Sequence, residues 1–99
     1  NLDQLTKLEA AHNQLEDISP LGEISGWEQL DLSYNQLEDI TPLAEGNNFQ
    51  VGAEVDLRYN QLDLEIGAGN LEAIYKLQSQ GVKVDYLPQK PGPREINLF

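Results

Sequence analysis

Apolar residues recur in the same order in two stretches of this chain, residues 5–21 and residues 27–43. In the second stretch Leu30 and Leu32 alternate with polar residues, as in a short β-strand with one buried face. Asn35 then interrupts the alternation, and three further aliphatic residues follow at wider spacing. This pattern is neither a helix period nor a plain strand period. It predicts a short strand, a turn and an extended return segment, repeated along the chain.

The offset between the two stretches is 22 residues, from residue 5 to residue 27, and a weaker third copy spans residues 52–62. A period of about 20–29 residues with the pattern L-x-x-L-x-L-x-x-N-x-L is typical of leucine-rich repeats. From Leu5 to Tyr86 the chain resembles the leucine-rich-repeat family. It is most similar to the short-repeat bacterial type, as in the internalins, and to related phosphatase-regulating repeat proteins.

The resemblance implies an α/β fold, a leucine-rich-repeat solenoid. Its short parallel sheet would form the concave face, an irregular or 3-10 segment the convex side, and a C-terminal helix plus strand the cap. Two rows of core residues are expected across adjacent strands. They are Leu8, Leu30, Val55 and Val82 in the first row, and Ala10, Leu32, Leu57 and Val84 in the second.

One leucine-rich-repeat domain is predicted over residues 1–87, followed by a proline-rich tail over residues 88–99. The first repeat has no capping segment before it, so upstream sequence or another chain is expected to cover its leucines. The predicted units are repeats near 5–26, 27–51 and 52–69, and a cap over 70–87.

The sequence also predicts the environment of several individual residues. Trp27 is expected in the core. The three residues added between 45 and 52 are expected to form a loop, with Phe49 turned inward and Val51 exposed or packed at an edge. Asn70 is predicted to be the N-cap of a helix that Gly81 ends.

An asparagine follows each predicted strand, at Asn13, Asn35 and Asn60, and none stands at the equivalent position near Leu87. The resemblance implies that these amides are buried and bond the backbone of the turn and of the adjacent coil. An amide suits this role because it offers two N–H donors and one acceptor oxygen.

Aligning the repeats places three rows of polar and aromatic residues on the concave face. They are Glu9, Asp31, Asp56 and Lys83, then Ala11, Ser33, Arg58 and Asp85, and finally His12, Tyr34, Tyr59 and Tyr86. Stacked tyrosines beside carboxylates are typical of recognition surfaces. The same neighbours could instead only stabilise the sheet, as cross-strand pairs do. The candidate binding residues are Glu9, Asp31, Ser33, Tyr34, Asp56, Arg58, Tyr59, Lys83, Asp85 and Tyr86.

The net charge of −11 argues against nucleic acid and anionic lipid as partners and favours a basic protein partner. A solvated acidic surface without a partner is the competing explanation. No run of about 18 apolar residues is present, so no membrane insertion is expected. The chain has no cysteine, which removes disulfides and thiolate metal sites. The resemblance favours an extracellular or cell-surface location on a bacterium.

Catalysis is disfavoured, because His12 is the only histidine and no nucleophile is paired with a base. No cofactor or metal is expected, although calcium could relieve the carboxylate row. The sequence favours a non-catalytic protein–protein interaction module. One alternative is a structural or adaptor subunit that docks through its uncapped N-terminal end and its C-terminal tail. A remote alternative is a fragment of a carbohydrate-active enzyme.

Overall fold

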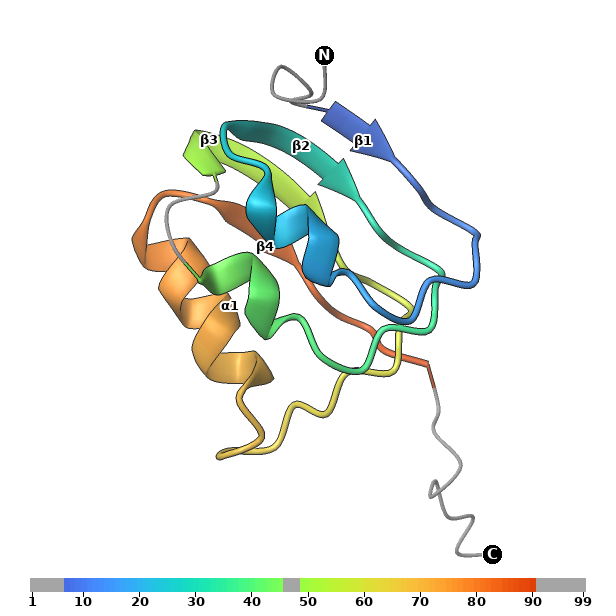
Figure 1. Ribbon diagram of the computed structural model, residues 1–99. Helices are drawn as coiled ribbons and strands as arrows, with labels where there is room; N and C mark the ends of the chain where they lie inside the picture. Colours follow the sequence, from blue (N-terminus) through green and yellow to red (C-terminus); the bar gives the residue numbers. More distant parts are fainter. Residues whose placement is uncertain (1–6, 46–48, 91–99) are drawn as a thin grey trace, which may run out of the picture.

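The computed structural model describes residues 7–45 and 49–90. They form one sheet, two short 3-10 helices and one α-helix (Figure 1). The elements in chain order are β1 (Lys7–Glu9), η2 (Ser19–Glu23), β2 (Trp27–Asp31), η3 (Thr41–Ala44), β3 (Phe49–Asp56), α1 (Asn70–Ser79) and β4 (Lys83–Asp85).

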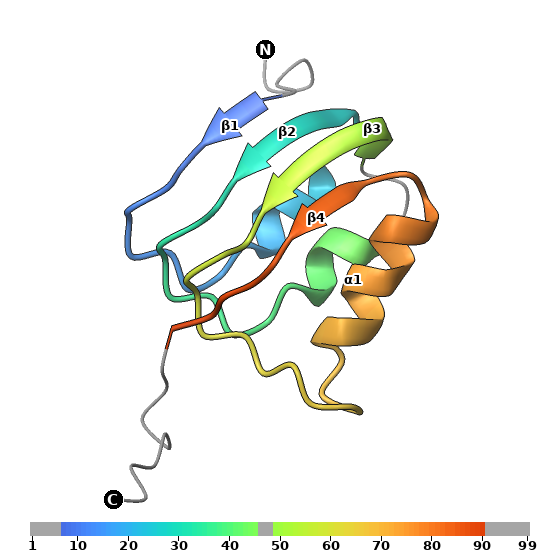
Figure 2. The ribbon, with the colours of Figure 1, turned by 180° about the vertical axis from the view of Figure 1, so that it is seen from behind.

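The four strands are parallel and lie in the order β1-β2-β3-β4. Each of the strands β1, β2 and β3 is followed by a turn and a return segment that leads back to the start of the next strand. The helices η2, η3 and α1 all cover the same face of the sheet (Figure 1). Seen from behind, none of the helices formed by residues 7–45 and 49–90 covers the other face (Figure 2). The described residues therefore have the two predicted layers, a parallel sheet on one side and irregular or 3-10 segments on the other.

One strand with the turn and return segment after it is called a coil here. The register of the sheet agrees with the prediction in the first three coils and differs in the fourth. Leu8 pairs with Leu30, and Leu30 with Val55, as predicted. The fourth residue of this row is Val84, and the predicted Val82 is wrong. The second predicted row fails in its last member for the same reason. A shift of two residues leaves every side chain on the same face of its strand, so the alternation in the sequence fits either register.

The 3-10 helices begin where the repeated Asp-Ile-Ser/Thr-Pro sequence directs them. The carboxylate of Asp17 accepts hydrogen bonds from the backbone N–H and the hydroxyl of Ser19, at 2.9 and 2.6 Å. Asp39 does the same for Thr41, at 2.8 and 2.7 Å. These bonds satisfy donors at each helix start, and the proline that follows has its φ preset for a helical turn. The hydrogen bonds from Ser19 hold the pKa of the Asp17 carboxyl below its ordinary value.

Asn70 begins α1 but does not cap it as predicted. The N-cap is Gly69, which has φ 96° and no capping side chain. Asn70 is 2% exposed, and its amide points into the return segments. Its oxygen accepts from the N–H of Ile40 at 2.9 Å, and its nitrogen donates to the carbonyl of Glu38 at 2.9 Å. The residue therefore connects the helix to the preceding coil.

The three added residues do not form a loop as predicted but lie within β3, between Phe49 and Glu54. Trp27 pairs with Phe49, whereas Gln29, two residues on, pairs with Glu54, five residues on. Three extra residues of β3 thus oppose β2 as a bulge. Phe49 packs against the core as predicted, and Val51 is 87% exposed. Residues 46–48 of the expected loop lie outside the described residues.

The core is a continuous apolar column between the sheet and the helices. Trp27 is fully buried, as predicted, and its indole N–H donates to the carbonyl of Leu21 at 3.2 Å. Burying the indole with its N–H bonded avoids an unsatisfied donor. No helix among the described residues is long and apolar enough to cross a membrane.

Candidate functional site

A row of four acidic residues crosses the sheet face that the helices leave open. Glu9, Asp31 and Asp56 pair across β1, β2 and β3, as the repeat alignment predicted. The fourth residue is Asp85, and the predicted Lys83 is wrong: Lys83 pairs with Glu54 instead. Parallel neighbours lie about 4.8 Å apart, so four carboxylates follow one another across the sheet. The row is more acidic than the sequence alignment indicated.

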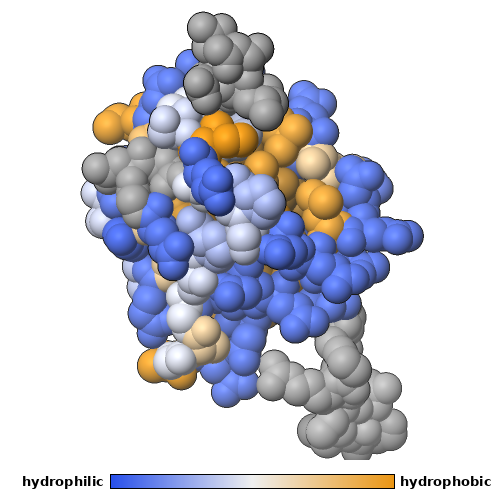
Figure 3. Space-filling model, in the orientation of Figure 1, coloured by the Kyte–Doolittle hydropathy of each residue, from blue (hydrophilic) through white to orange (hydrophobic). Residues whose placement is uncertain are grey.

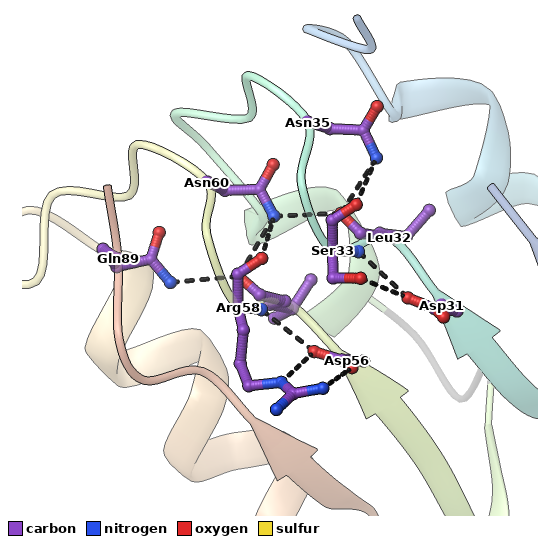
Figure 4. Close-up of polar contacts among 9 residues, drawn as sticks. Asp31, Leu32, Ser33, Asn35, Asp56, Arg58, Asn60 and Gln89 are labelled. Carbon is purple, nitrogen blue, oxygen red and sulfur yellow. Dashed lines mark hydrogen bonds and ion pairs between the residues drawn. The ribbon is translucent and has the colours of Figure 1, made fainter. Parts of the chain in front are cut away.

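Two of these carboxylates are held by residues two positions further along the chain. Asp31 accepts from the backbone N–H and the hydroxyl of Ser33, at 3.1 and 2.7 Å, and Ser33 is only 4% exposed (Figure 4). Asp56 accepts from the backbone N–H of Arg58 at 3.1 Å and from its guanidinium at 2.9 and 2.7 Å. These local bonds fix the carboxylates against the sheet instead of leaving them to rotate.

The Asp56–Arg58 pair changes the titration of both groups. Partial burial acts to raise the pKa of the Asp56 carboxyl. The hydrogen bonds and positive charge of Arg58 outweigh burial and hold that pKa below its ordinary value of 3.8. Asp56 in turn raises the pKa of Arg58, and Asp85 adds to this effect. Asp56 therefore stays ionised in mildly acidic solution.

Three aromatic rings stack beside the acidic row, where the strands end. The rings of His12 and Tyr34 lie 4.3 Å apart at 12°, and those of Tyr34 and Tyr59 lie 4.4 Å apart at 11°. All three residues have positive φ, of 62°, 57° and 61°, respectively. Non-glycine residues rarely adopt this conformation, which here turns each chain out of its strand and aligns the rings. Tyr34 is 38% exposed, so the stack presents aromatic surface to solvent.

Tyr86, predicted as the fourth ring, does not belong to this stack. It follows Val84 by two residues, so it continues the inward side of β4, and it packs against the hydrophobic core. With the observed register, the position after Tyr59 in the stack falls on Pro88, whose carbonyl accepts from the N–H of Tyr59 at 2.8 Å. The predicted register, two residues short, placed Tyr86 in the turn that follows the strand, whereas it extends the inward-facing side of the strand.

A ladder of amide side chains runs behind the turns (Figure 4). Asn35 and Asn60 are fully buried. The Asn35 oxygen accepts from the N–H of Leu15 at 3.1 Å, and its nitrogen donates to the carbonyl of Ala10 at 3.0 Å, both in the preceding coil. Asn60 repeats this arrangement with Leu37 and the carbonyl of Leu32, at 3.1 and 2.9 Å. Each amide thus connects two successive coils.

Gln89 is the next member of the ladder, and the sequence analysis missed it. Its oxygen accepts from the N–H of Leu62 at 3.1 Å, and its nitrogen donates to the carbonyl of Leu57 at 3.0 Å. Gln89 follows Val84 by five residues, as Asn60 follows Val55. Aligning residues 52–60 with residues 81–89 would have revealed it, since Gly-x-x-Val-Asp opens both segments.

Residues 88–90, predicted to begin the tail, contact the third coil and the second. The N–H of Lys90 donates to the carbonyl of Asn60 at 2.8 Å, and its ammonium group reaches the carbonyl of Asn35 at 2.6 Å. The rest of the predicted tail, residues 91–99, lies outside the described residues.

The first coil differs from the later ones in burial. Asn13 is exposed, and its nitrogen bonds only carbonyls of its own turn, those of Ala10 and Ala11. Leu15 and Leu21 are partly buried, whereas their counterparts in the second coil are fully buried. Hydrophobic residues reach the surface between η2 and the sheet edge, within a mostly hydrophilic surface (Figure 3). The aliphatic side chains of the first coil are therefore less completely covered than those of the second coil.

Two hollows lie along the open sheet face. The smaller, of about 130 Å³, is lined by Gln29, Leu30, Asp31, Glu54, Val55, Asp56 and Asp85. The larger, of about 360 Å³, lies at the bulge of β3. Within residues 7–45 and 49–90, no group of three or more His, Cys, Asp or Glu side chains is arranged to hold a metal ion.

Comparison with known proteins supports the family indicated by this geometry. Residues 3–45 match the family model of leucine-rich repeats in two copies, and this match supports a leucine-rich-repeat protein. The parallel four-stranded sheet and single α-helix are consistent with the α/β fold of that family. Leucine-rich repeats generally mediate protein–protein interactions and are generally non-catalytic. No curated protein and no solved structure matched the chain.

Proposed function

We propose that this chain is a non-catalytic protein-binding module that uses the open, concave face of a leucine-rich-repeat solenoid of the short-repeat, internalin-like type. The observation that carries the proposal is the row Glu9–Asp31–Asp56–Asp85 beside the stacked rings of His12, Tyr34 and Tyr59. No helix in the described part of the chain covers this face, so a partner can reach it (Figure 2).

The partner is a basic protein surface. Four aligned carboxylates repel one another across the sheet, and lysine or arginine side chains from a partner relieve this repulsion. Charge complementarity of this kind accelerates association and selects against acidic partners. The exposed edges of the tyrosine rings add rigid contact area, which binding hot spots favour. The net charge of −11 acts in the same direction at longer range.

Peptide display against the purified chain tests the proposal. Selected peptides are expected to be rich in lysine and arginine, and to lose binding to the double variant Asp31→Lys/Asp56→Lys. The matched control is Glu16→Lys/Glu38→Lys, which makes the same charge change at exposed residues of the return segments. Selected peptides that bind the parent and the Asp31/Asp56 variant equally would contradict the proposal.

The second candidate is an adaptor role in which the first coil docks into a larger assembly. It is favoured by the incomplete burial of that coil, where Leu15 and Leu21 are only partly buried and Asn13 is exposed. A single substitution in the first coil distinguishes the two roles. Leu15→Lys is expected to abolish assembly in the adaptor role and to leave peptide binding unchanged in the concave-face role.

A further inference from the structure

The bulge of β3 builds a hollow that the regular repeat pattern would not contain. The three extra residues between Phe49 and Glu54 displace the strand from β2, and Gly52 adopts a φ of 88° within it. The hollow measures about 360 Å³. It is lined by Lys7, Glu28, Gln29, Gln50, Val51, Gly52, Ala53 and Glu54.

This hollow adjoins the smaller one beside the acidic row, and the two together are called the groove below. Gln29 and Glu54 line both, so they mark the place where the two hollows meet. The groove therefore runs along β2 and β3, from the bulge at the start of the strands to Asp56 and Asp85 near their ends.

The two ends of the groove differ in chemistry. At the bulge, Val51 exposes 87% of its surface, although it is apolar and sits on a strand. The bulge is held in place, because Gln50 donates to the carbonyl of Gly26 at 2.9 Å and the N–H of Gly52 donates to the carbonyl of Gly81 at 2.9 Å. The exposed valine is thus presented by a fixed backbone and not by a free loop.

At the other end the groove is strongly acidic. Asp31, Asp56 and Asp85 line it together with Glu54. Glu54 pairs with Gln29 and Lys83 through the sheet, but its carboxylate makes no hydrogen bond or ion pair with another residue of the described part of the chain, and so can accept a partner's donor. Arg58 pairs with Asp56, but a second cation can still bind among the remaining carboxylates.

We infer that this groove binds an extended peptide segment that places an apolar side chain against Val51 and a lysine or arginine side chain among Glu54, Asp31 and Asp85. Both ends lie along the same strands, whose rise is about 3.3 Å per residue. The apolar and the basic residue of the segment are therefore about four positions apart. The inference rests on the proposed function, since it specifies the partner segment of the same sheet face.

A titration with a designed peptide tests the inference. The probe is a glycine–serine peptide of about ten residues with one leucine and, about four positions further on, two arginines. Amide chemical shifts of the labelled chain report affinity and location. Parent protein is expected to show shifts at Gly52 and Glu54, and replacing the peptide's leucine by serine is expected to weaken binding at least about threefold.

Val51→Ser is the decisive variant, and Ile66→Ser is its matched control, because Ile66 is 93% exposed and lies outside the groove. Val51→Ser is expected to weaken binding of the leucine peptide at least about threefold, and Ile66→Ser to leave it unchanged. No shifts with the parent, or equal binding to Val51→Ser and the parent, would overturn the inference.

The same titration separates this inference from the proposed function. If Asp31→Lys/Asp56→Lys abolishes peptide binding while Val51→Ser does not change it, the acidic face binds basic partners and the groove inference is wrong. If the double charge variant binds the peptide as well as the parent does, the proposed function is wrong and the inference fails with it.

Discussion

The side-chain oxygen of Asn60 lies 3.1 Å from the backbone nitrogen of Leu37, in the preceding coil, and accepts its hydrogen bond. Asn35 makes the same contact with Leu15. In each case a buried amide satisfies backbone groups that the turn leaves without partners. A leucine column can only stack if these polar groups are bonded, because an unbonded buried N–H costs about 1–3 kcal/mol.

Replacing Asn35 by alanine removes hydrogen bonds to both its own coil and the preceding one. We expect Asn35→Ala to lower the free energy of unfolding by about 1–3 kcal/mol in urea denaturation. Asn13→Ala is the matched control, since Asn13 has the same place in its repeat but is exposed. An Asn35→Ala protein as stable as the Asn13→Ala protein would show that the ladder does not support the fold.

Gln89 is expected to support the last coil in the same way. Gln89→Ala leaves the N–H of Leu62 without its acceptor and is expected to cost about 1–2 kcal/mol of unfolding free energy. In Gln89→Ala, hydrogen exchange of the Leu62 amide should accelerate more than that of the Leu37 amide, because the Leu37 N–H keeps its hydrogen bond to Asn60. Gln61→Ala, at an exposed position, provides the baseline. Unchanged exchange at Leu62 would remove Gln89 from the ladder.

Asn70→Asp distinguishes a buried connector from a helix cap. Asparagine and aspartate are about equally good N-caps, so a capping residue would tolerate the exchange. In the observed arrangement the Asn70 nitrogen donates to the carbonyls of Glu38 and Asp63. An aspartate would place a carboxylate against those carbonyls. We expect a lower melting temperature for Asn70→Asp than for the parent, whereas an unchanged melting temperature would restore the capping interpretation.

The repeat pattern predicted the fold and the first three coils correctly. When apolar residues recur at the same spacing in each coil, equivalent residues pack against one another in adjacent coils. The row Leu8–Leu30–Val55 and the stack of His12, Tyr34 and Tyr59 follow from it directly. The fourth coil was misaligned by two residues, because strand alternation has a period of two and tolerates such a shift. The ladder residue Gln89 would have resolved this, but it is a glutamine where the repeats have asparagine.

The misalignment also explains which residues were placed in the wrong row, although Lys83 stays on the open face of the sheet beside Glu54. Lys83 and Tyr86 moved with the register, so the acidic row gained Asp85 and lost a lysine. The bulge could not be predicted from composition, since a three-residue insertion can form a loop or widen a strand with equal ease. The buried role of Asn70 depends on contacts about 30 residues away in the chain, which local sequence does not encode.

Acid should destabilise the chain partly through Asp56. Its folded-state pKa lies below the ordinary value of 3.8, so this carboxylate adds stability at pH values above that value. The contribution is lost as the pH falls through the folded-state pKa. Urea midpoints measured from about pH 5 to pH 2 should fall less steeply for Asp56→Asn than for the parent. Parallel curves for the two proteins would show that the Asp56–Arg58 pair has no net effect on stability.

The central structural claim is that all four coils stack in one register, with Val84 beside Val55. Scalar coupling across hydrogen bonds, between an amide nitrogen and the accepting carbonyl carbon, tests it most directly. The N–H of Leu57 donates to the carbonyl of Asp85 at 2.7 Å, so a Leu57–Asp85 correlation is predicted. A correlation from Leu57 to the carbonyl of Lys83 would contradict this register and with it the fourth carboxylate of the acidic row.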